Sequence, residues 1–389
     1  MLWTSTLYHM YNVLLVSIAS FFDSTGEIPF MFKRAGCSVD VFCNKTSWLL
    51  TNQYHDNWIE SSEEHEMFKN QLLQLVNDKP DHYDWIVLLE DITIKLMNES
   101  IDSEAIFKKV LPITKIQNRD ILSSKAGLSS VCEKYGIATP RYVNYSETMD
   151  IETIKQKLDF PILLKEDFSF SGIGIHYCED ASKLQDCLDK VRVKTNLVLQ
   201  EFIKGEDIGL EALFRDGELI TYNCGEVLTY MYDKFSFTTR RKYYQSEEIA
   251  ALLRNLGKSV GLNSFASIQY VYHPERKIYY LIEVDARTNS WMPYSRFTGY
   301  DFSDGIKRIM TNQLTYIETG TTIPDKRVEV AIFDRDLRRC IKNKDYKGLL
   351  PWMLNTNGYW KFIPLYDGKI SKRIFKKLMK DFLKIKNNA

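Results

Sequence analysis

The sequence predicts a chain of mixed α/β and α+β class: a parallel α/β unit, then a unit with antiparallel strands, and last a small C-terminal extension. Apolar strands alternate with amphipathic helices over roughly the first 110 residues, which is typical of a parallel sheet with crossover helices. Further along, Arg215–Gly217 and His273–Arg276 are turn signals between apolar runs and indicate β-hairpins. At 389 residues, two or three domains are expected.

The first unit is expected to contain three buried strands rich in Val, Ile and Leu. These are Val13–Ile18, Ser38–Cys43 and Tyr83–Glu90. The turn at Asp23–Gly26 opens a helix that ends near Gly36, and Ser61–Glu64 resembles a capping box before a second helix. No G-x-G-x-x-G follows the first strand, so a dinucleotide-binding Rossmann unit is disfavoured.

A linker begins at Leu111-Pro112, and the second unit follows it. Its expected strands are Pro161–Lys165, Asn196–Glu201, Asp207–Phe214, Glu218–Asn223, Phe265–Tyr272 and a run ending at Asp285. Helices are expected at Asp180–Arg192 and Ser246–Val260. From about residue 311 a tail follows that contains Trp352, Trp360 and a basic helix.

Composition excludes several classes of function. The chain has 51 basic and 51 acidic residues, so no global field favours nucleic acid. No run approaches the roughly 18 apolar residues of a membrane span. The seven cysteines are scattered without a C-x-x-C pair, which predicts reduced thiols and a cytoplasmic protein.

The most informative stretch is the strand that ends in Glu283, Asp285 and Arg287. Side chains two apart on a strand share a face, so both carboxylates are expected to point into one space. Gln269 lies on the preceding strand of the predicted hairpin. Together these oxygens form a set that Mg²⁺ prefers. The alternative is a strand end with solvated acids beside Arg287.

A second candidate region lies around Lys165, at the end of an apolar strand and before the small-residue segment Ser169–Ile175. A lysine there can reach nucleotide phosphates, and a loop with little side-chain bulk can fold its N–H groups over them. The next strand and bend, Leu197–Asp207, offer a flat apolar slot for a purine and an acceptor for a ribose. The alternative is an edge-strand lysine before an ordinary turn.

The order and spacing of these residues resemble the ATP-grasp superfamily of carboxylate–amine and carboxylate–thiol ligases, and its biotin-carboxylase- and carbamoyl-phosphate-synthetase-like members in particular. The matching positions, in order along the chain, are Lys125, Lys165, a Gly/Ser loop, Gln200–Asp207, Glu211, Gln269 and Glu283-x-Asp285-x-Arg287. The resemblance implies a pre-ATP-grasp α/β domain at 1–112. It also implies a two-part ATP-grasp domain at 113–310, with a lid at about 125–200, and a C-terminal extension at 311–389.

The resemblance also implies roles for individual residues. Lys125 and Lys165 would contact phosphates; Ser171, Gly172 and Gly174 would belong to the lid; Glu201, Phe202 and Ile203 would border the adenine; and Asp207 would take the ribose. Gln269, Glu283 and Asp285 would hold one or two Mg²⁺ ions, for which Mn²⁺ can substitute. Arg287 would act on the moving phosphoryl together with Lys165. Asn289 would orient a phosphate or the metal shell, or only cap the strand end.

The chain departs from the family pattern at several positions. Asp285 stands where Asn is usual, Ala286 stands where Pro is usual, and Gln269 stands where an acid is commoner. The two charge changes roughly compensate, so the departures affect the number of metal ions more than metal binding itself. The lid is also poorer in glycine than in many members.

The activity implied is that of an ADP-forming ligase: ATP phosphorylates a small-molecule carboxylate, and an amine displaces phosphate from the acyl phosphate. Two alternatives stay open. One is a kinase that stops at a phosphorylated product, and the other is a regulatory protein that binds ATP without turnover. The sequence is compatible with a homo-oligomer and does not identify the substrates.

Three further segments are ambiguous. Arg240–Lys242 is expected in a loop, where it either holds an acidic substrate or is solvated. Tyr294, Arg296 and Tyr300 follow the metal strand and are candidates for an acceptor pocket. The basic C-terminal helix, which has an apolar stripe around Leu378, is either a membrane-surface helix or a packed terminal helix with a solvated basic face. We favour the packed helix, because the chain carries no other membrane signal.

Overall fold

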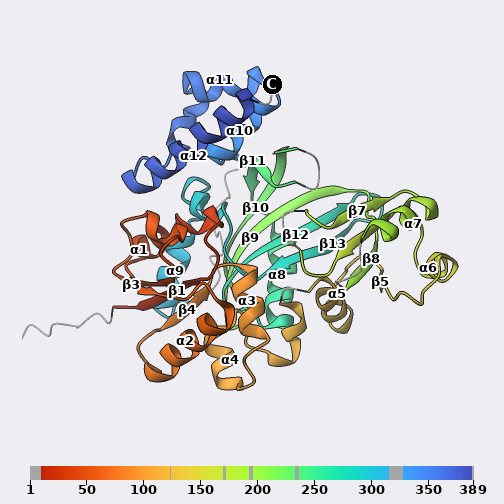
Figure 1. Ribbon diagram of the computed structural model, residues 1–389, viewed down its shortest axis with the longest axis horizontal. Helices are drawn as coiled ribbons and strands as arrows, with labels where there is room; N and C mark the ends of the chain where they lie inside the picture. The colour runs from red at the N-terminus through yellow and green to blue at the C-terminus, as the bar shows by residue number, and fades with distance from the viewer. Residues whose placement is uncertain are drawn as a thin grey trace, which may run out of the picture.

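A four-stranded parallel sheet lies at the N-terminal end of the protein, in the order β3-β2-β1-β4. The computed structural model describes residues 10–122, 124–169, 172–191, 196–232, 236–314 and 327–387 (Figure 1). The strands of this sheet are β1 (Asn12–Ser17), β2 (Ser38–Cys43), β3 (Asn57–Glu60) and β4 (Trp85–Leu88). The helices of this unit are η1 (Asp23–Thr25), α1 (Ile28–Ala35), η2 (Trp48–Thr51), α2 (His65–Asp78), α3 (Asp91–Asn98) and α4 (Glu104–Val110).

The three strands expected in this unit are confirmed, but β3 was not predicted. This strand lies at the sheet edge and three of its four residues are exposed, so it lacks an apolar pattern. The expected capping box at Ser61–Glu64 is wrong. Glu64 itself caps α2, because its carboxylate accepts hydrogen bonds from the N–H groups of Glu66 and Met67.

A six-stranded sheet in the order β13-β12-β9-β10-β11-β14 forms the centre of the molecule, and every neighbouring pair is antiparallel. Its strands are β9 (Glu206–Arg215), β10 (Glu218–Tyr230), β11 (Thr238–Tyr244), β12 (Phe265–His273), β13 (Ile278–Asp285) and β14 (Val328–Ala331). The accompanying helices are η3 (Ile116–Ile121), α8 (Glu247–Val260), η4 (Met292–Phe297) and α9 (Phe302–Met310). Trp85 of β4 stacks on Phe265 of β12 with ring centroids 5.7 Å apart, so the two sheets share one core.

A second antiparallel sheet of four strands, in the order β5-β8-β6-β7, lies at the right of Figure 1; it falls in the segment expected to form a lid, and we refer to it as the lid sheet. Its elements are α5 (Lys125–Lys134), β5 (Tyr142–Asn144), α6 (Ile151–Lys157), β6 (Ile162–Glu166), β7 (Ile175–Cys178), α7 (Ala181–Lys190) and β8 (Leu197–Glu201). Ser124 caps α5 by accepting a hydrogen bond from the Gly127 N–H.

The C-terminal extension is joined to the central sheet, because β14 pairs with β11. Its helices are α10 (Phe333–Lys342), α11 (Tyr346–Leu354), η5 (Thr356–Phe362) and α12 (Gly368–Asn387). Ile370 and Leu378 of α12 are buried, while much of its basic face is exposed. This agrees with the packed helix that we favoured. Within the residues described, no helix is long and apolar enough to cross a membrane.

Candidate functional site

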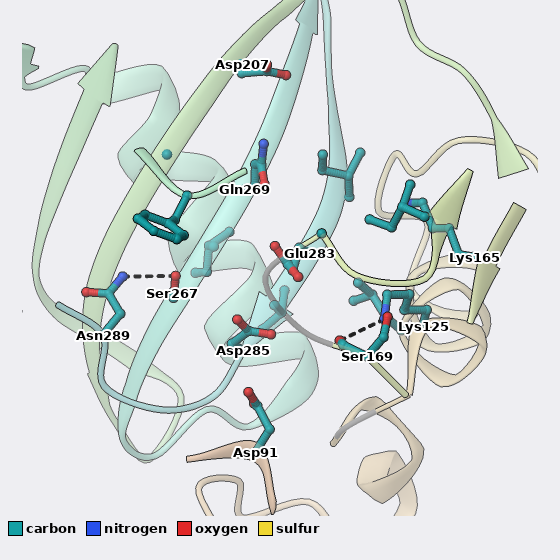
Figure 2. A pocket seen from close by; sticks show the side chains of 18 of the residues that line it. Asp91, Lys125, Lys165, Ser169, Asp207, Ser267, Gln269, Glu283, Asp285 and Asn289 are labelled. Carbon is teal, nitrogen blue, oxygen red and sulfur yellow. Dashed lines mark hydrogen bonds between the residues drawn. The ribbon is translucent and has the colours of Figure 1, made fainter. Parts of the chain in front are cut away.

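A cavity of about 350 Å³ lies between the lid sheet, the central sheet and the start of α3 (Figure 2). Most of the predicted site residues line it, although they come from segments far apart in the chain. They are Lys125, Lys165, Gly172, Glu201, Phe202, Ile203, Asp207, Gln269, Glu283, Asp285, Arg287 and Asn289. Gly174 is not among the lining residues, and Ser171 lies outside the residues that the structure describes.

The β12–β13 hairpin, which carries the predicted metal ligands, contributes one wall of this cavity. The pairing of its two strands is irregular at Gln269. Gln269 of β12 lies directly opposite Glu283 of β13, whereas Tyr270 is paired with Leu281, so Ile282 is an extra residue in β13. Such a bulge turns a strand locally. Here it allows both Ile282 and Glu283 to reach the cavity, while Leu281 stays in the core.

Glu283 and Gln269 present side-chain oxygens that no hydrogen bond uses in the part of the chain that the structure describes. Among the described residues, neither side chain makes a hydrogen bond, and the Glu283 carboxylate makes no ion pair within 4 Å. Both lie at the cavity in Figure 2, near the labelled Asp285. The described residues hold no group of three His, Cys, Asp or Glu side chains arranged as a metal site. The donor set of two carboxylates and one amide nevertheless fits a hard cation such as Mg²⁺.

Asp285 is already engaged by a cation. Its Oδ2 accepts a hydrogen bond from Nη2 of Arg287 at 2.7 Å, and Nε of Arg287 lies 2.6 Å from Oδ2 of Asp91. Burial raises the pKa of Asp285 well above its usual value; Arg287 opposes the shift, and Glu283 adds to it. A bound divalent cation would counter this shift, because it stabilises the carboxylate form.

Two lysines stand on the lid side of the cavity. Lys165 is buried at the end of β6, and its Nζ donates a hydrogen bond to Oε1 of Gln200 at 2.6 Å. Burial lowers the pKa of Lys165 to about 8, against the attraction of Glu283 and with a contribution from Lys125. Lys125, the first residue of α5, donates to Oγ and O of Ser169 at 3.0 and 3.1 Å. Both ammonium groups are therefore placed to meet an anion that enters the cavity.

The glycines of the lid have a clear conformational role. Gly172 and Gly174 adopt φ values of +76° and +74°, which side-chain-bearing residues rarely adopt. A Cβ on Gly174 would also come within 2.7 Å of the Glu166 carboxyl carbon. Gly172 thus lines the cavity, and Gly174 allows the loop to return against β6.

Residues at the other end of the cavity offer an apolar slot and a polar rim. Phe202 and Ile203 follow β8 and line the cavity together with Ile282. The Glu201 carboxylate is held by Arg141 at 3.2 Å and by Arg276 at 3.5 Å. The Asp207 carboxylate, at the start of β9, accepts a hydrogen bond from the Tyr230 hydroxyl at 2.9 Å.

Asn289 is held by a buried polar network. Its Nδ2 donates to Glu211 Oε1 at 3.0 Å and to Ser267 Oγ at 3.1 Å, and its Oδ1 accepts from the N–H groups of Trp291 and Met292. Glu211 in turn forms a 2.6 Å ion pair with Arg241. Asn289 therefore fixes the turn between β13 and η4 by hydrogen bonds on both of its amide atoms.

The loop expected at Arg240–Lys242 is wrong, and the acceptor residues expected after β13 lie outside the cavity described above, although Tyr294 lines a second, smaller cavity. Arg240–Lys242 lies in strand β11, not in a loop, and Arg240 pairs with Asp336 of α10 at 2.7 Å. The acceptor residues expected at Tyr294, Arg296 and Tyr300 do not line the main cavity. Instead, Arg296 lies over the rings of Phe297 and Tyr366, with its guanidinium carbon 4.6 and 4.9 Å from their centroids.

Other lining residues escaped the sequence analysis. Ile282 had a weak signal, because the core residues Leu281 and Val284 are three apart where a regular strand has two. Gln200 precedes a predicted site residue, but only pairing of β6 with β8 brings it to Lys165. Arg335 of α10 enters the cavity from the C-terminal extension, and nothing in its sequence surroundings indicates this.

Comparisons with known proteins agree with this geometry. The family of RimK-like ATP-grasp domains matches residues 122–213. The carbamoyl phosphate synthase large chain of Rubrobacter xylanophilus is 23% identical over 258 residues, which cover 60% of this chain and 22% of that relative. The chain thus spans about a fifth of the length of this relative.

Solved structures show the same fold at low identity. The L-amino acid ligase from Bacillus licheniformis superposes with a TM-score of 0.57 and 18% identity, covering 82% of this chain and 77% of that one. An N5-carboxyaminoimidazole ribonucleotide synthetase, solved as its ADP complex, superposes with a TM-score of 0.61 and 14% identity, covering 86% and 85%. The predicted fold class and the resemblance on which it was based are confirmed.

Proposed function

The chain carries an ATP-grasp domain, and from that premise we propose that it is an ATP-dependent ligase that joins a small-molecule carboxylate to an amine and releases ADP and phosphate. One observation carries the proposal. Lys125 and Lys165 on the lid side of one cavity face Gln269 and Glu283 on the central sheet (Figure 2). Cations on one wall and unpaired oxygens on the other suit a nucleotide triphosphate with its divalent metal.

The proposed roles at the nucleotide follow from position. Phe202, Ile203 and Ile282 would enclose the adenine, and the backbone around Glu201 would meet its polar edge. Asp207 would accept hydrogen bonds from the ribose hydroxyls. The lid loop at Gly172 would cover the phosphates with backbone N–H groups, because its left-handed glycine conformation exposes them.

Lys125 and Lys165 would hold the phosphates on the lid side. Gln269, Glu283 and Asp285 would hold the Mg²⁺, which supplies neutralisation of phosphate charge when it is bound. Arg287 would place its guanidinium beside the transferred phosphoryl after its contact with Asp285 weakens. Asn289 would act at a distance, by fixing the turn that follows Arg287.

Positioning and electrostatics would then perform the reaction without a protein nucleophile. A substrate carboxylate oxygen attacks the γ-phosphorus, the β–γ bridging oxygen leaves with ADP, and an acyl phosphate forms. The amine next attacks the acyl carbon, phosphate leaves, and the amine loses a proton. Water must be excluded from the acyl phosphate, and the enclosed position between lid and central sheet supports this.

The test is to trap the acyl phosphate. Pairs of amino acids and carboxylic acids are first screened for stimulated ADP release. With an active acid, ATP and Mg²⁺, hydroxylamine in place of the amine is expected to give a hydroxamate, ADP and phosphate. Arg287→Ala is expected to lower hydroxamate formation more than ATP affinity, whereas Arg254→Ala on α8 is expected to change neither.

Three results would contradict the proposal. AMP and pyrophosphate as products would exclude this mechanism. A stable phosphorylated product that does not react with hydroxylamine would instead indicate a kinase. ATP binding without turnover for any acid and amine pair would indicate a regulatory nucleotide-binding protein.

A further inference from the structure

The sequence of the C-terminal extension carries a large excess of positive charge, of which Arg335, Arg338, Arg339 and Lys377 are ion-paired. Residues 327–389 hold 16 Lys and Arg against six Asp and Glu, although the whole chain has 51 of each. A chain without net charge is thus divided into a basic extension and an acidic remainder. Such asymmetry indicates an interaction with a negatively charged surface.

The same extension also exposes an unusual amount of apolar surface. Of 18 large hydrophobic side chains that are exposed in the described part of the chain, nine lie between residues 346 and 383. They are Tyr346, Leu350, Met353, Leu354, Trp360, Leu365, Phe375, Met379 and Leu383. Clustered exposure of this kind marks interaction sites on soluble domains.

Helix α12 places both features on one outward face. Phe375, Met379 and Leu383 are four residues apart and form an apolar row that is 43%, 59% and 58% exposed. A lysine row lies beside it, also four residues apart and also exposed. It consists of Lys372, Lys376 and Lys380. A helix with adjacent apolar and basic rows is the pattern of a surface-lying amphipathic helix.

The remaining faces of α12 are fixed by packing against the body of the protein. Leu378 is buried under α10, and the Arg373 guanidinium lies 3.9 Å from the centroid of the Trp48 ring and donates to the Ser47 carbonyl. Lys377 pairs with Asp23. Because these contacts hold the helix from two sides, Met379 and Leu383 are directed outward, and Phe375 lies at the edge of the packed side, with its ring centroid 5.5 Å from that of Phe333.

The inner side of α12 is packed, as we favoured from the sequence, and we propose that its exposed side also docks this protein on an anionic lipid surface, with the helix lying in the plane of the membrane. The apolar row would enter the boundary between headgroups and acyl chains, and the lysine row would meet the anionic headgroups. Figure 1 shows α12 at the opposite end of the molecule from α6 and α7 of the lid, so docking leaves the lid free to move. The inference is independent of the activity proposed above.

Charge and chemistry favour lipid over other occupants. A symmetric dimer through this face would bring two lysine rows together, and like charges in contact repel. A nucleic acid would pair with the lysines but would leave the apolar row exposed to water. An anionic bilayer offers acyl chains to the apolar row and negatively charged headgroups to the lysine row.

The experiment measures flotation of the full-length protein with vesicles of phosphatidylcholine alone and of phosphatidylcholine with 30 mol% phosphatidylserine. Binding is expected only to the anionic vesicles and is expected to weaken with added salt. Two triple variants separate the contributions of the rows. They are Lys372→Gln/Lys376→Gln/Lys380→Gln and Phe375→Ser/Met379→Ser/Leu383→Ser. The first is expected to lower the partition coefficient roughly 100-fold.

The matched control removes the same charge elsewhere. It neutralises three exposed lysines outside the extension: Lys79→Gln/Lys157→Gln/Lys190→Gln. This control is expected to bind as wild type does, and circular dichroism and the melting temperature check that all variants are folded. Failure of the wild type to float with anionic vesicles would overturn the proposal. Equal flotation of wild type and both row variants would do so too, as would a concentration-dependent dimer lost in the Ser variant without any lipid binding.

Discussion

Arg287 and Asp91 form an ion pair with an N–O distance of 2.6 Å, although 196 residues separate them in the sequence. Asp91 begins α3 directly after the N-terminal sheet, and Arg287 follows β13 of the central sheet. The same guanidinium binds Asp285 at 2.7 Å. The end of the predicted metal strand is therefore tied to the N-terminal unit, and charge at Asp285 is coupled to the contact between the two units.

Asp91→Ala is expected to destabilise the protein by about 1–3 kcal/mol, because it removes one of the two carboxylate partners of the largely buried Arg287 guanidinium. The other partner, Asp285, remains. Urea unfolding measures this change. In a double-mutant cycle with Arg287→Ala, the two losses are expected to be non-additive. Additive losses would show that the ion pair does not couple the two units.

Glu283→Ala is expected to abolish turnover and to weaken Mg·ATP binding, because it removes a carboxylate that makes no hydrogen bond and no ion pair within the described part of the chain. Gln269→Ala, which removes a neutral ligand, is expected to leave part of the activity. Calorimetric titration with Mg·ATP measures both affinities. Glu275→Ala removes a carboxylate from the turn of the same hairpin and serves as the control. Equal affinity in Glu283→Ala and wild type would refute the metal assignment.

Lys165→Ala is expected to weaken ATP binding roughly 30-fold or more, the loss of a charge-assisted hydrogen bond worth about 2 kcal/mol. Lys125→Ala is expected to have a smaller effect, because Lys125 is less buried. Lys204→Ala, in the exposed turn after β8, is the control. If Lys165→Ala bound ATP with the wild-type Kd, Lys165 would not contact the phosphates and its role would be structural.

ATP affinity is also expected to depend on pH through Lys165. Burial lowers its pKa to about 8, so the free enzyme loses this charge as the pH rises through 8. Binding of an anion then requires proton uptake, and the apparent affinity is expected to fall about tenfold between pH 7 and pH 9. The free energy of unfolding depends on pH in the opposite direction. Between pH 8 and the ordinary lysine pKa of 10.5, Lys165 holds its proton in the unfolded chain but has lost it in the folded protein. The contribution of Lys165 to stability therefore increases as the pH rises through this range. A titration in buffers of different ionisation enthalpy measures the uptake, and Lys165→Arg is expected to abolish it.

Asn289→Ala is expected to act on stability and only indirectly on catalysis. The change removes the acceptor for the Trp291 and Met292 N–H groups and one partner of Glu211, and the loss of these hydrogen bonds is expected to cost about 1–3 kcal/mol. Thermal unfolding and the KM for ATP are measured in parallel. Asn289→Asp is expected to cost more, because it places a second carboxylate beside Glu211. A variant with unchanged melting temperature and a large loss of kcat would instead support direct contact with substrate.

Local patterns in the sequence predicted most of the elements that carry the site. A run of apolar residues bounded by turn signals is a property of each strand by itself, so β1, β2, β6, β8 and the β12–β13 hairpin were found close to their observed bounds. The common face of Glu283 and Asp285 follows from the two-residue period of a strand. Strand β11 was missed because its Thr-Thr-Arg-Arg-Lys sequence is polar; Arg241 is buried by pairing with Glu211, and the half-buried Arg240 pairs with Asp336.

What the sequence by itself determined is therefore the set of elements, the fold class and the chemical types gathered at the strand ends. Only the tertiary structure decided which of these groups have partners. It ties Arg287 to Asp91, leaves Glu283 without a hydrogen-bonding partner among the described residues and brings Gln200 to Lys165. The reason is physical: the pattern of one strand fixes which way its side chains point, whereas a hydrogen bond or ion pair depends on atoms delivered by another segment within about 3 Å, and that distance is set by packing of the whole chain.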